Sequence, residues 1–239
     1  MNKSLIFIVF VLISFNCFSQ EEKYGDFEFF TGMPVIYGIL DYDGIETINT
    51  GLSFSFGMGA SNYNIFNDKK FGIVFSGNLI FPGKFIHGVK GKETHYKTSI
   101  DFFLLDMMFG VGYRLYENNK FRFPVTFGLH SLSLSGTTKS SASDTHELFK
   151  WSFGISSSIA VQFNINQFVY FFTRLHGTFD FLSYTKHIVY TGINVGGKMA
   201  YFIDGKDFFA LSAYFGITPV LGIGLKMDAI HRKKTTKNE

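Results

Sequence analysis

The feature that most limits how this chain can fold is a strict alternation of large apolar residues with small or polar ones. It is clearest over 52–60, where Leu, Phe, Phe, Met and Ala alternate with Ser, Ser, Gly and Gly. The stretches 149–163 and 189–201 repeat the pattern. Because successive side chains of a β-strand point to opposite faces, alternation with period two predicts strands with one apolar face and one small, polar face.

The pattern predicts an all-β chain of about ten strands, with about eight as the alternative. Pro219 cannot donate a ladder hydrogen bond and so favours a turn, whereas the unbroken alternation over 209–227 would also suit one long strand. The expected strands cover 25–38, 50–61, 70–82, 99–116, 121–134, 148–164, 167–182, 187–203, 208–217 and 220–229.

Alternation alone does not distinguish a membrane barrel from a soluble sandwich, so the composition of the two faces decides. The small face is dominated by Gly and Ser, and Gly is unfavourable on the exterior of a soluble strand. The chain has 32 Phe and 12 Tyr among 239 residues, which a water-soluble domain could hide only in a large two-sided core. We therefore expect a closed, antiparallel, up-and-down transmembrane β-barrel that displays aromatic residues to lipid.

The expected connections differ between the two ends of the strands. Those at 117–120, 165–166 and 204–207 are tight turns rich in Asn, Asp and Gly, and 62–69 is a longer exception on the same side. The connections at 39–49, 83–98 and 135–147 are longer and polar. Short periplasmic turns and longer outer loops are typical of bacterial outer-membrane barrels.

Both ends of the chain are expected to lie outside the barrel. Residues 1–19 have the basic, apolar and small-residue regions of a cleaved signal peptide, and the apolar run from Leu5 to Phe15 is too short to span a membrane. The barrel is expected over 20–230 and a polar tail over 231–239. Cleavage would remove Cys17, the one cysteine of the chain.

The signal sequence, alternating strands, chain length and turn asymmetry resemble the small outer-membrane barrels of the OmpA/OmpX and OmpW kind. This resemblance is one of pattern over the mature chain, and it implies a location in the cell outer membrane of a Gram-negative bacterium. It also implies partners: outer-membrane lipids, lipopolysaccharide-like glycolipids and the barrel-assembly machinery. The chain departs from those barrels at its C-terminus, which is a polar tail and not an aromatic residue.

Strand parity assigns a set of polar residues to the barrel interior. If opposite charges pair there, they plug the barrel; if they do not, they line a polar path or a binding site for a small solute. A barrel of about eight strands leaves an interior that side chains just fill, which favours the plug. The candidate lumen-lining residues are Asp106, Arg114, Arg122, His130, Lys150, Arg174, His176, Asp180 and Lys198.

A lipid-modifying enzyme is the weakest interpretation. His130 with Ser131 and Ser133 loosely resembles the His/Ser/acid set of lipid A deacylases, but both serines have the opposite parity and would point away from the imidazole. We therefore assign no catalytic residue. The loop histidines have no spacing that forces a metal site, no cofactor motif occurs, and a formal net charge of +3 gives no indication of nucleic-acid binding.

The sequence thus favours a small non-enzymatic barrel that supports the envelope or passes small, apolar molecules. In a conduit, Leu132 and Leu134, with Phe102 and Leu104 if they point inward, would form the wall. The alternative is a surface protein that adheres to a host partner through its outer loops. The outer segment with Lys84, Lys90, Lys92 and Lys97, and with His87 and His95, is basic and could meet anionic lipopolysaccharide.

Overall fold

The computed structural model describes residues 25–41, 46–49, 53–65, 68–81, 84–88, 94–97, 103–139, 144–195 and 198–227, and these residues form twelve β-strands. The predicted signal peptide and polar tail lie outside these residues. None of the described residues belongs to a helix long and apolar enough to cross a membrane. The strands are β1 (Gly25–Gly32), β2 (Val35–Asp41), β3 (Glu46–Asn49), β4 (Phe54–Ile65), β5 (Asp68–Phe81), β6 (Lys84–Gly88), β7 (Thr94–Lys97), β8 (Phe103–Glu117), β9 (Phe121–Lys139), β10 (Asp144–Asn164), β11 (Val169–Val195) and β12 (Lys198–Lys226).

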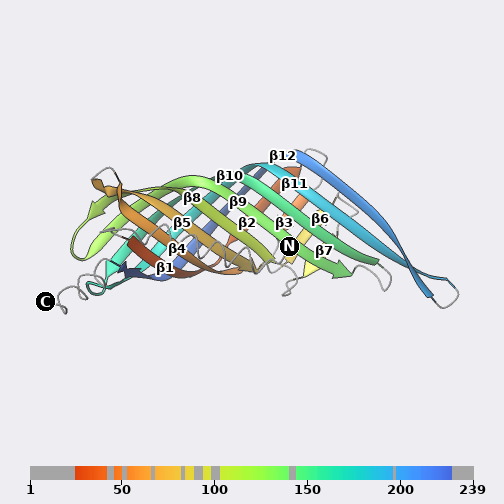
Figure 1. Cartoon of the computed structure of the whole chain (residues 1–239), viewed down its shortest axis with the longest axis horizontal. Coiled ribbons are helices and arrows are strands. Elements are labelled where there is room, and N and C mark those ends of the chain that lie inside the picture. The colour runs from red at the N-terminus through yellow and green to blue at the C-terminus, as the bar shows by residue number, and fades with distance from the viewer. Residues whose placement is uncertain are drawn as a thin grey trace.

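Eight of these strands form one antiparallel sheet that closes on itself (Figure 1). Neighbours follow the order β1-β4-β5-β8-β9-β10-β11-β12, and β12 pairs back onto β1 through seven residue pairs. β2 continues the first strand beyond a break at Met33–Pro34 and also pairs with β12. The predicted all-β, closed, antiparallel barrel is therefore confirmed, but the prediction of ten strands is wrong: the closed sheet has eight.

The two extra predicted strands come from the last third of the chain. β11 and β12 are 27 and 29 residues long, so the predicted strand 187–203 runs across their connection and the predicted turn 204–207 lies inside β12. Pro219 also lies inside β12, opposite Leu175. Its C=O accepts a hydrogen bond from Met33 N at 3.1 Å. Since N and C=O of one strand residue point the same way, the missing N–H of Pro219 faces the break between β1 and β2, where a proline costs no ladder bond.

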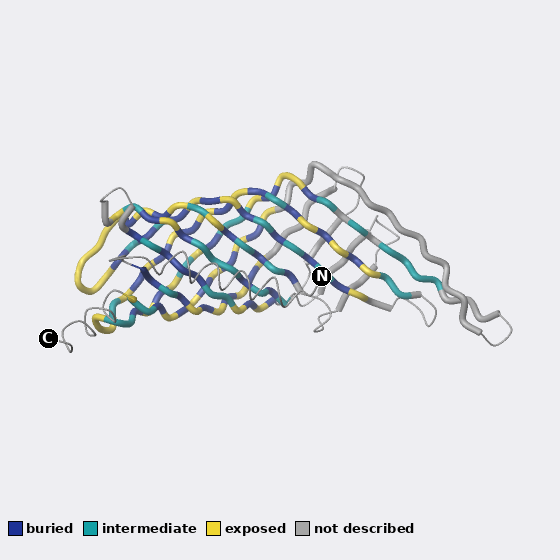
Figure 2. Tube along the Cα trace, viewed as in Figure 1, coloured by how far each residue is buried: buried dark blue, intermediate teal, exposed yellow. Residues whose placement is uncertain are grey.

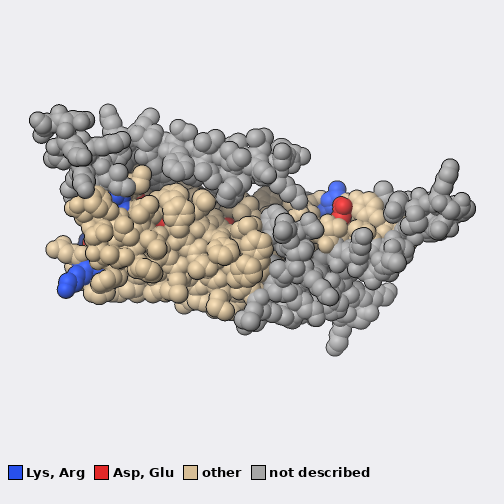
Figure 3. All heavy atoms as spheres, turned by 90° about the horizontal axis from the view of Figure 1, so that it is seen from below, with Lys and Arg blue, Asp and Glu red and all other residues tan. Residues whose placement is uncertain are grey.

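Burial alternates along the described barrel strands, as the sequence pattern predicts (Figure 2). On β9, Phe127 and Leu129 are 56% and 54% exposed, whereas the next residue, His130, is 1% exposed. The outer wall is thus apolar and the interior polar, the reverse of a soluble barrel. On the face seen in Figure 3 the wall consists almost entirely of uncharged side chains, and the Lys and Arg atoms lie at its left end and, beside acidic atoms, toward its right end. An apolar surface of this extent requires lipid around it.

Aromatic pairs mark both edges of this apolar wall. Rings at two levels of a barrel are typical of residues that sit at the two membrane interfaces. The pairs are Tyr116–Phe123 and Phe121–Phe163 beside the short turns, and Phe54–Phe81 and Phe149–Tyr184 toward the opposite end.

The short turns lie at one end of the barrel, together with the start of β1 and the end of β12, and we refer to this end as periplasmic. In the β8–β9 turn, Asn118 Oδ1 accepts hydrogen bonds from the backbone N–H groups of Lys120 and Phe121 at 2.8 and 2.6 Å. In the β10–β11 turn, Asn166 Oδ1 accepts from Phe168 and Val169, both at 2.8 Å. Asparagine thus supplies the acceptor that a tight turn needs, at two of the predicted turns.

At the opposite, extracellular end, β11 and β12 continue beyond their neighbours as a long hairpin (Figure 1). β2 pairs with β12 only as far as Ser212, and within the described strands residues 198–211 pair with β11 alone. A second sheet of three strands, β3-β6-β7, occupies part of the predicted loops 39–49 and 83–98. The predicted loop 135–147 is shorter than expected, because β9 and β10 extend into it.

Glycines on the inner face make room for large rings. A Cβ on Gly224 would lie 2.0 Å from the Tyr170 ring, and one on Gly222 would lie 2.5 Å from the Phe172 ring. The sequence pattern of small inner residues therefore has a packing cause: each glycine vacates the volume that an aromatic side chain of the neighbouring strand fills.

Candidate functional site

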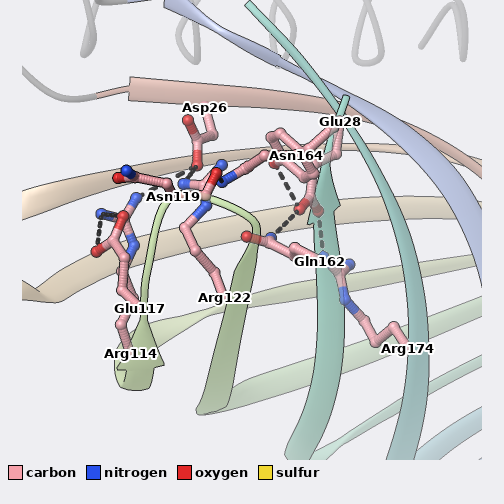
Figure 4. Close-up of polar contacts among 10 residues, drawn as sticks. Asp26, Glu28, Arg114, Glu117, Asn119, Arg122, Gln162, Asn164 and Arg174 are labelled. Atoms are coloured by element: carbon pink, nitrogen blue, oxygen red, sulfur yellow. Dashed lines mark hydrogen bonds and ion pairs between the residues drawn. The ribbon is translucent and has the colours of Figure 1, made fainter. Parts of the chain in front are cut away.

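The barrel interior holds the polar side chains, and those nearest the periplasmic end form an ion-paired layer (Figure 4). Asp26 Oδ2 accepts hydrogen bonds from Arg122 Nη1 at 2.8 Å and from Arg114 Nη2 at 3.3 Å. These three side chains are at most 7% exposed. Arg114 also donates to Glu117 at 3.2 Å, at the rim, where the Glu117 side chain is 41% exposed. Buried charges of this kind persist only when they are paired, and Asp26 supplies the pairing.

Glu28, two residues farther along β1, makes a second cluster on the same face (Figure 4). Its carboxylate accepts hydrogen bonds from Gln162 Nε2 at 3.1 Å and Tyr170 OH at 2.9 Å, and it forms an ion pair with Arg174. These partners come from β10 and β11, whereas those of Asp26 come from β8 and β9. The two acids of β1 therefore bind residues of four other strands across the lumen.

Aromatic rings fill the space around the three arginines. Stacking on a ring stabilises a guanidinium that has lost its water, and it holds the planar group in one orientation. The guanidinium carbons lie 4.0 Å (Arg114 over Tyr63), 4.6 Å (Arg122 over Tyr170) and 4.8 Å (Arg174 over Phe172) from the ring centroids.

A second layer, at mid-height in the wall, centres on His130 of β9. Its Nδ1 lies 2.6 Å from Asp180 Oδ1 and its Nε2 lies 2.9 Å from Asp106 Oδ1, so the ring bridges β11 and β8. Ser152 Oγ donates to the other oxygen of Asp180 at 2.5 Å, and His176 Nε2 lies 4.0 Å from Asp106. Both nitrogens of the His130 ring are thereby engaged with protein oxygens.

Toward the extracellular end the inner face changes from polar to apolar. Five buried side chains of β5, β8, β9 and β10 pack together there: Ile80, Leu104, Leu132, Leu134 and Leu148. The strand register places Ile80 beside Ser55 of β4 and beside Leu104 of β8. The register thus connects the apolar layer to Gly32, which pairs with Ser55 at the last rung of the β1–β4 ladder.

A small cavity separates the charged layer from the His130 layer. Its volume is about 10 Å³, and its lining includes Glu28, Tyr63, Thr126, Ser158 and Arg174. Thr126 and Ser158 share a hydrogen bond of 2.7 Å at its edge. Such a volume has room for about one water molecule.

Of the nine residues that strand parity assigned to the lumen, the structure places eight within the closed sheet. Seven of them belong to the two polar layers, and Lys150 is buried beside the apolar layer, opposite Leu134. The side chain of Lys198 lies outside the described residues, and so does Phe102. The sequence reasoning missed Asp26 and Glu28, although they alternate with Phe27 and Phe29 as inward residues should.

The geometry also bears on the enzyme interpretation. Ser131 is on the outer face, where its Oγ accepts a hydrogen bond from Trp151 Nε1 at 2.5 Å, and it does not face His130. Ser152, on the inner face, donates to Asp180 and not to the imidazole, so the ring is not placed to take its proton. Within the described ranges, no three His, Cys, Asp or Glu side chains converge to hold a metal ion.

No protein-family model matches the sequence, and no curated protein sequence matches it either. Solved structures do. A major outer membrane protein from Thermus thermophilus aligns with a TM-score of 0.54 and 9% identity, over 84% of this chain and 98% of that one. OprG from Pseudomonas aeruginosa (TM-score 0.46, 13% identity, 86% and 97% covered) and Ail from Yersinia pestis (0.42, 11%, 85% and 98%) are more distant in shape.

At these identities the likeness concerns the fold, and it confirms the predicted resemblance to small outer-membrane barrels at that level. The closed eight-strand sheet and the exposed apolar wall lead independently to the same conclusion. The chain folds as a transmembrane β-barrel of the kind found in outer membranes.

Proposed function

We propose that this chain is a non-enzymatic outer-membrane barrel with a sealed lumen, which anchors the extracellular β11–β12 hairpin and its neighbouring strands to the envelope. The observation that supports this proposal is the cross-lumen pairing. Asp26 and Glu28 on β1 bind arginines of β8, β9 and β11, and His130 links β8 to β11 above them. Two successive layers of buried, paired side chains across the lumen support a sealed interior.

Ion flux through liposomes that contain the refolded protein tests the seal. The wild-type protein should pass no more ions than empty liposomes. Arg122→Ala together with Arg174→Ala removes two guanidinium groups from the plug and should raise the flux. Glu117→Gln, which changes a half-exposed rim residue, is the matched control and should stay sealed. A conducting wild-type barrel would refute the proposal.

The anchoring role predicts that the hairpin is accessible from outside the cell. Protease added to intact cells should cut between residues 187 and 208 and leave a membrane-embedded fragment that still migrates as folded barrel. Full resistance of the chain on intact cells, with cleavage after lysis, would place the hairpin on the other side of the membrane and contradict the proposal.

A second candidate function is a conduit for small apolar molecules, and one observation favours it. The apolar layer around Leu104 and Leu134 is connected through the register of Ile80 and Ser55 to the last β1–β4 rung, and beyond Gly32↔Ser55 no described residue of β2 pairs with β4. An apolar solute could enter from outside and leave sideways into lipid without crossing the ion pairs. Uptake of an apolar fluorescent dye into liposomes, lost in Leu134→Asp but kept in Leu129→Asp on the outer face, would support it.

A further inference from the structure

The two hydrogen bonds of the His130 ring need more hydrogen atoms than a neutral imidazole has. Nδ1 lies 2.6 Å from Asp180 Oδ1, and Nε2 lies 2.9 Å from Asp106 Oδ1. A stable nitrogen–oxygen contact at these distances contains a hydrogen atom, and no water molecule fits between the two heavy atoms. A neutral imidazole carries one N–H, and an ionised carboxylate carries no hydrogen. The two contacts therefore need one hydrogen more than a neutral ring and two carboxylates supply.

Neighbouring polar groups donate to the oxygens of the two acids that face away from the ring. Ser152 Oγ donates to Asp180 Oδ2 at 2.5 Å. The Asn78 side chain forms a hydrogen bond with Asp106. Since Asn78 Oδ1 has no partner among the described residues, the amide nitrogen is the group that donates. Both acids are thus surrounded by donors, which is the environment that ionised carboxylates require.

The other cationic or titratable side chains near this layer lie farther from the two acids or are engaged elsewhere. His176 Nε2, from β11, lies 4.0 Å from Asp106 Oδ2, which is beyond hydrogen-bond distance. Arg174, two residues before it, is paired with an acid of the layer below. Lys150 lies four residues along β10, or about 13 Å, from the residue opposite His130. His130 is therefore the side chain that the structure shows bonded to both acids.

Burial and basicity indicate where the additional hydrogen resides. His130, Asp180 and Asp106 are 1%, 0% and 5% exposed. An imidazole nitrogen is a stronger base than a carboxylate oxygen, so a proton shared among these groups binds to the ring. An imidazolium donates one charge-assisted hydrogen bond to each acid and places a positive charge between two negative ones. Buried charges persist when they are paired in this way.

We propose that Asp106, His130 and Asp180 form a proton-binding site in the lumen, in which the ring is held as an imidazolium between two carboxylates. The bound proton makes one side chain of β9 a double donor that links β8 to β11. Without it, one ring nitrogen would present a lone pair to a carboxylate oxygen, and one of the two links would be lost. This inference goes beyond the sealed lumen of the proposed function and does not depend on it.

Nitrogen-15 NMR of the full mature chain, labelled at histidine and refolded in detergent micelles, counts the hydrogens on each ring. At about pH 8 a solvated imidazole is neutral and carries one N–H. The His130 ring, identified by through-bond correlation to its own backbone, should show a one-bond nitrogen–hydrogen coupling at both nitrogens. A wild-type ring with a single attached hydrogen would overturn the proposal, because a protonated acid would then close the second contact.

The variant Asp106→Asn tests whether the second carboxylate holds the proton. An amide can donate to a ring nitrogen, so the ring should drop from two attached hydrogens to one at the same pH. Ser152→Ala is the matched control, since it removes a hydrogen bond from the same layer but keeps both carboxylates, and the ring should keep two hydrogens. Equal counts in the two variants would overturn the proposal. The wild-type count stands without either variant, and the flux assay measures the seal separately, so the two proposals can fail independently.

Discussion

The pairing of Asp26 gives the sharpest quantitative prediction, because one arginine has a buried and an exposed partner. Asp26 accepts from Arg114 and Arg122 inside the barrel, and Glu117 accepts from Arg114 at the rim. Among the described residues, Arg122 Nε and Nη2 have no hydrogen-bond partner, so Arg122 depends on Asp26 through Nη1. The substitution Asp26→Asn keeps the size of the side chain and removes its charge.

Loss of one partner of a buried ion pair costs about 3–5 kcal/mol, because the other charge stays buried without compensation. An amide oxygen can still accept one hydrogen bond, and the Tyr170 ring lies 4.6 Å from the Arg122 guanidinium, which favours the lower end of that range. We expect Asp26→Asn to lower the free energy of unfolding by about 3 kcal/mol, a roughly 150-fold change in the equilibrium. Glu117→Gln should cost less than about 1 kcal/mol, because water screens an exposed pair.

Urea unfolding of the refolded barrels in lipid vesicles measures both values, with equal m-values as the check that each transition exposes the same surface. Arg122→Met in the Asp26→Asn background removes the stranded charge and should recover part of the loss. Equal effects of Asp26→Asn and Glu117→Gln would refute the argument, because it attributes the difference to burial. A double variant less stable than Asp26→Asn alone would refute it as well.

Three further predictions concern the wall and the hairpin. Gly110→Ala should abolish the faster-migrating folded band on unheated gels, because a Cβ there would lie 2.2 Å from Phe127 O and 2.4 Å from Gly128 Cα. The control Gly177→Ala should keep this band, because its Cβ would meet nothing closer than 3.9 Å. Trp151 is 47% exposed on the outer wall and lies about 33 Å above the periplasmic end of β10, near the outer headgroups. Its fluorescence should therefore be quenched more by lipids brominated near the headgroup than by lipids brominated at the chain end. Stronger quenching by the lipids brominated at the chain end would contradict this depth. Joining Lys186 to its register partner Asp207 through Asn-Gly should remove the tip of the hairpin and still give a folded barrel, and loss of the folded band would show that the fold needs residues 187–206.

The fold was predictable because a barrel in lipid requires apolar and polar residues to alternate along each strand. Phe127, Leu129 and His130 fall on the faces that alternation assigns to them, and the asparagine turns lie near where their composition predicts them. The strand count was less predictable. A proline normally interrupts a strand because it cannot donate a ladder hydrogen bond. Pro219 loses no such bond, because the neighbouring strand is broken at Met33–Pro34, and periodicity does not reveal this break.

Which side chains pair inside the barrel could not be predicted from the sequence, for a related reason. Parity says that Arg122 and Arg174 point inward, but which acids they meet depends on the shear and tilt of the closed sheet. Asp26 and Glu28 alternate with Phe27 and Phe29, so parity alone would place them on the inner face of the first strand, although it would not pair them with arginines. The apolar layer was partly predicted through Leu132 and Leu134, whereas its connection to the last β1–β4 rung depends on the ladder register.

The placement of both acids on β1 has a consequence for how the molecule assembles. Asp26 is 96 residues from Arg122 in the chain, and Glu28 is 146 residues from Arg174. Both contacts close long loops, and closing a long loop costs chain entropy, so we expect them to form late in folding. They can form only when strands from the N-terminal, central and later parts of the sequence are together in one ring. In a truncated or incompletely inserted chain these charges would stay buried in the membrane without their partners. The ion pairs that fill the lumen therefore stabilise the complete barrel and destabilise incomplete ones.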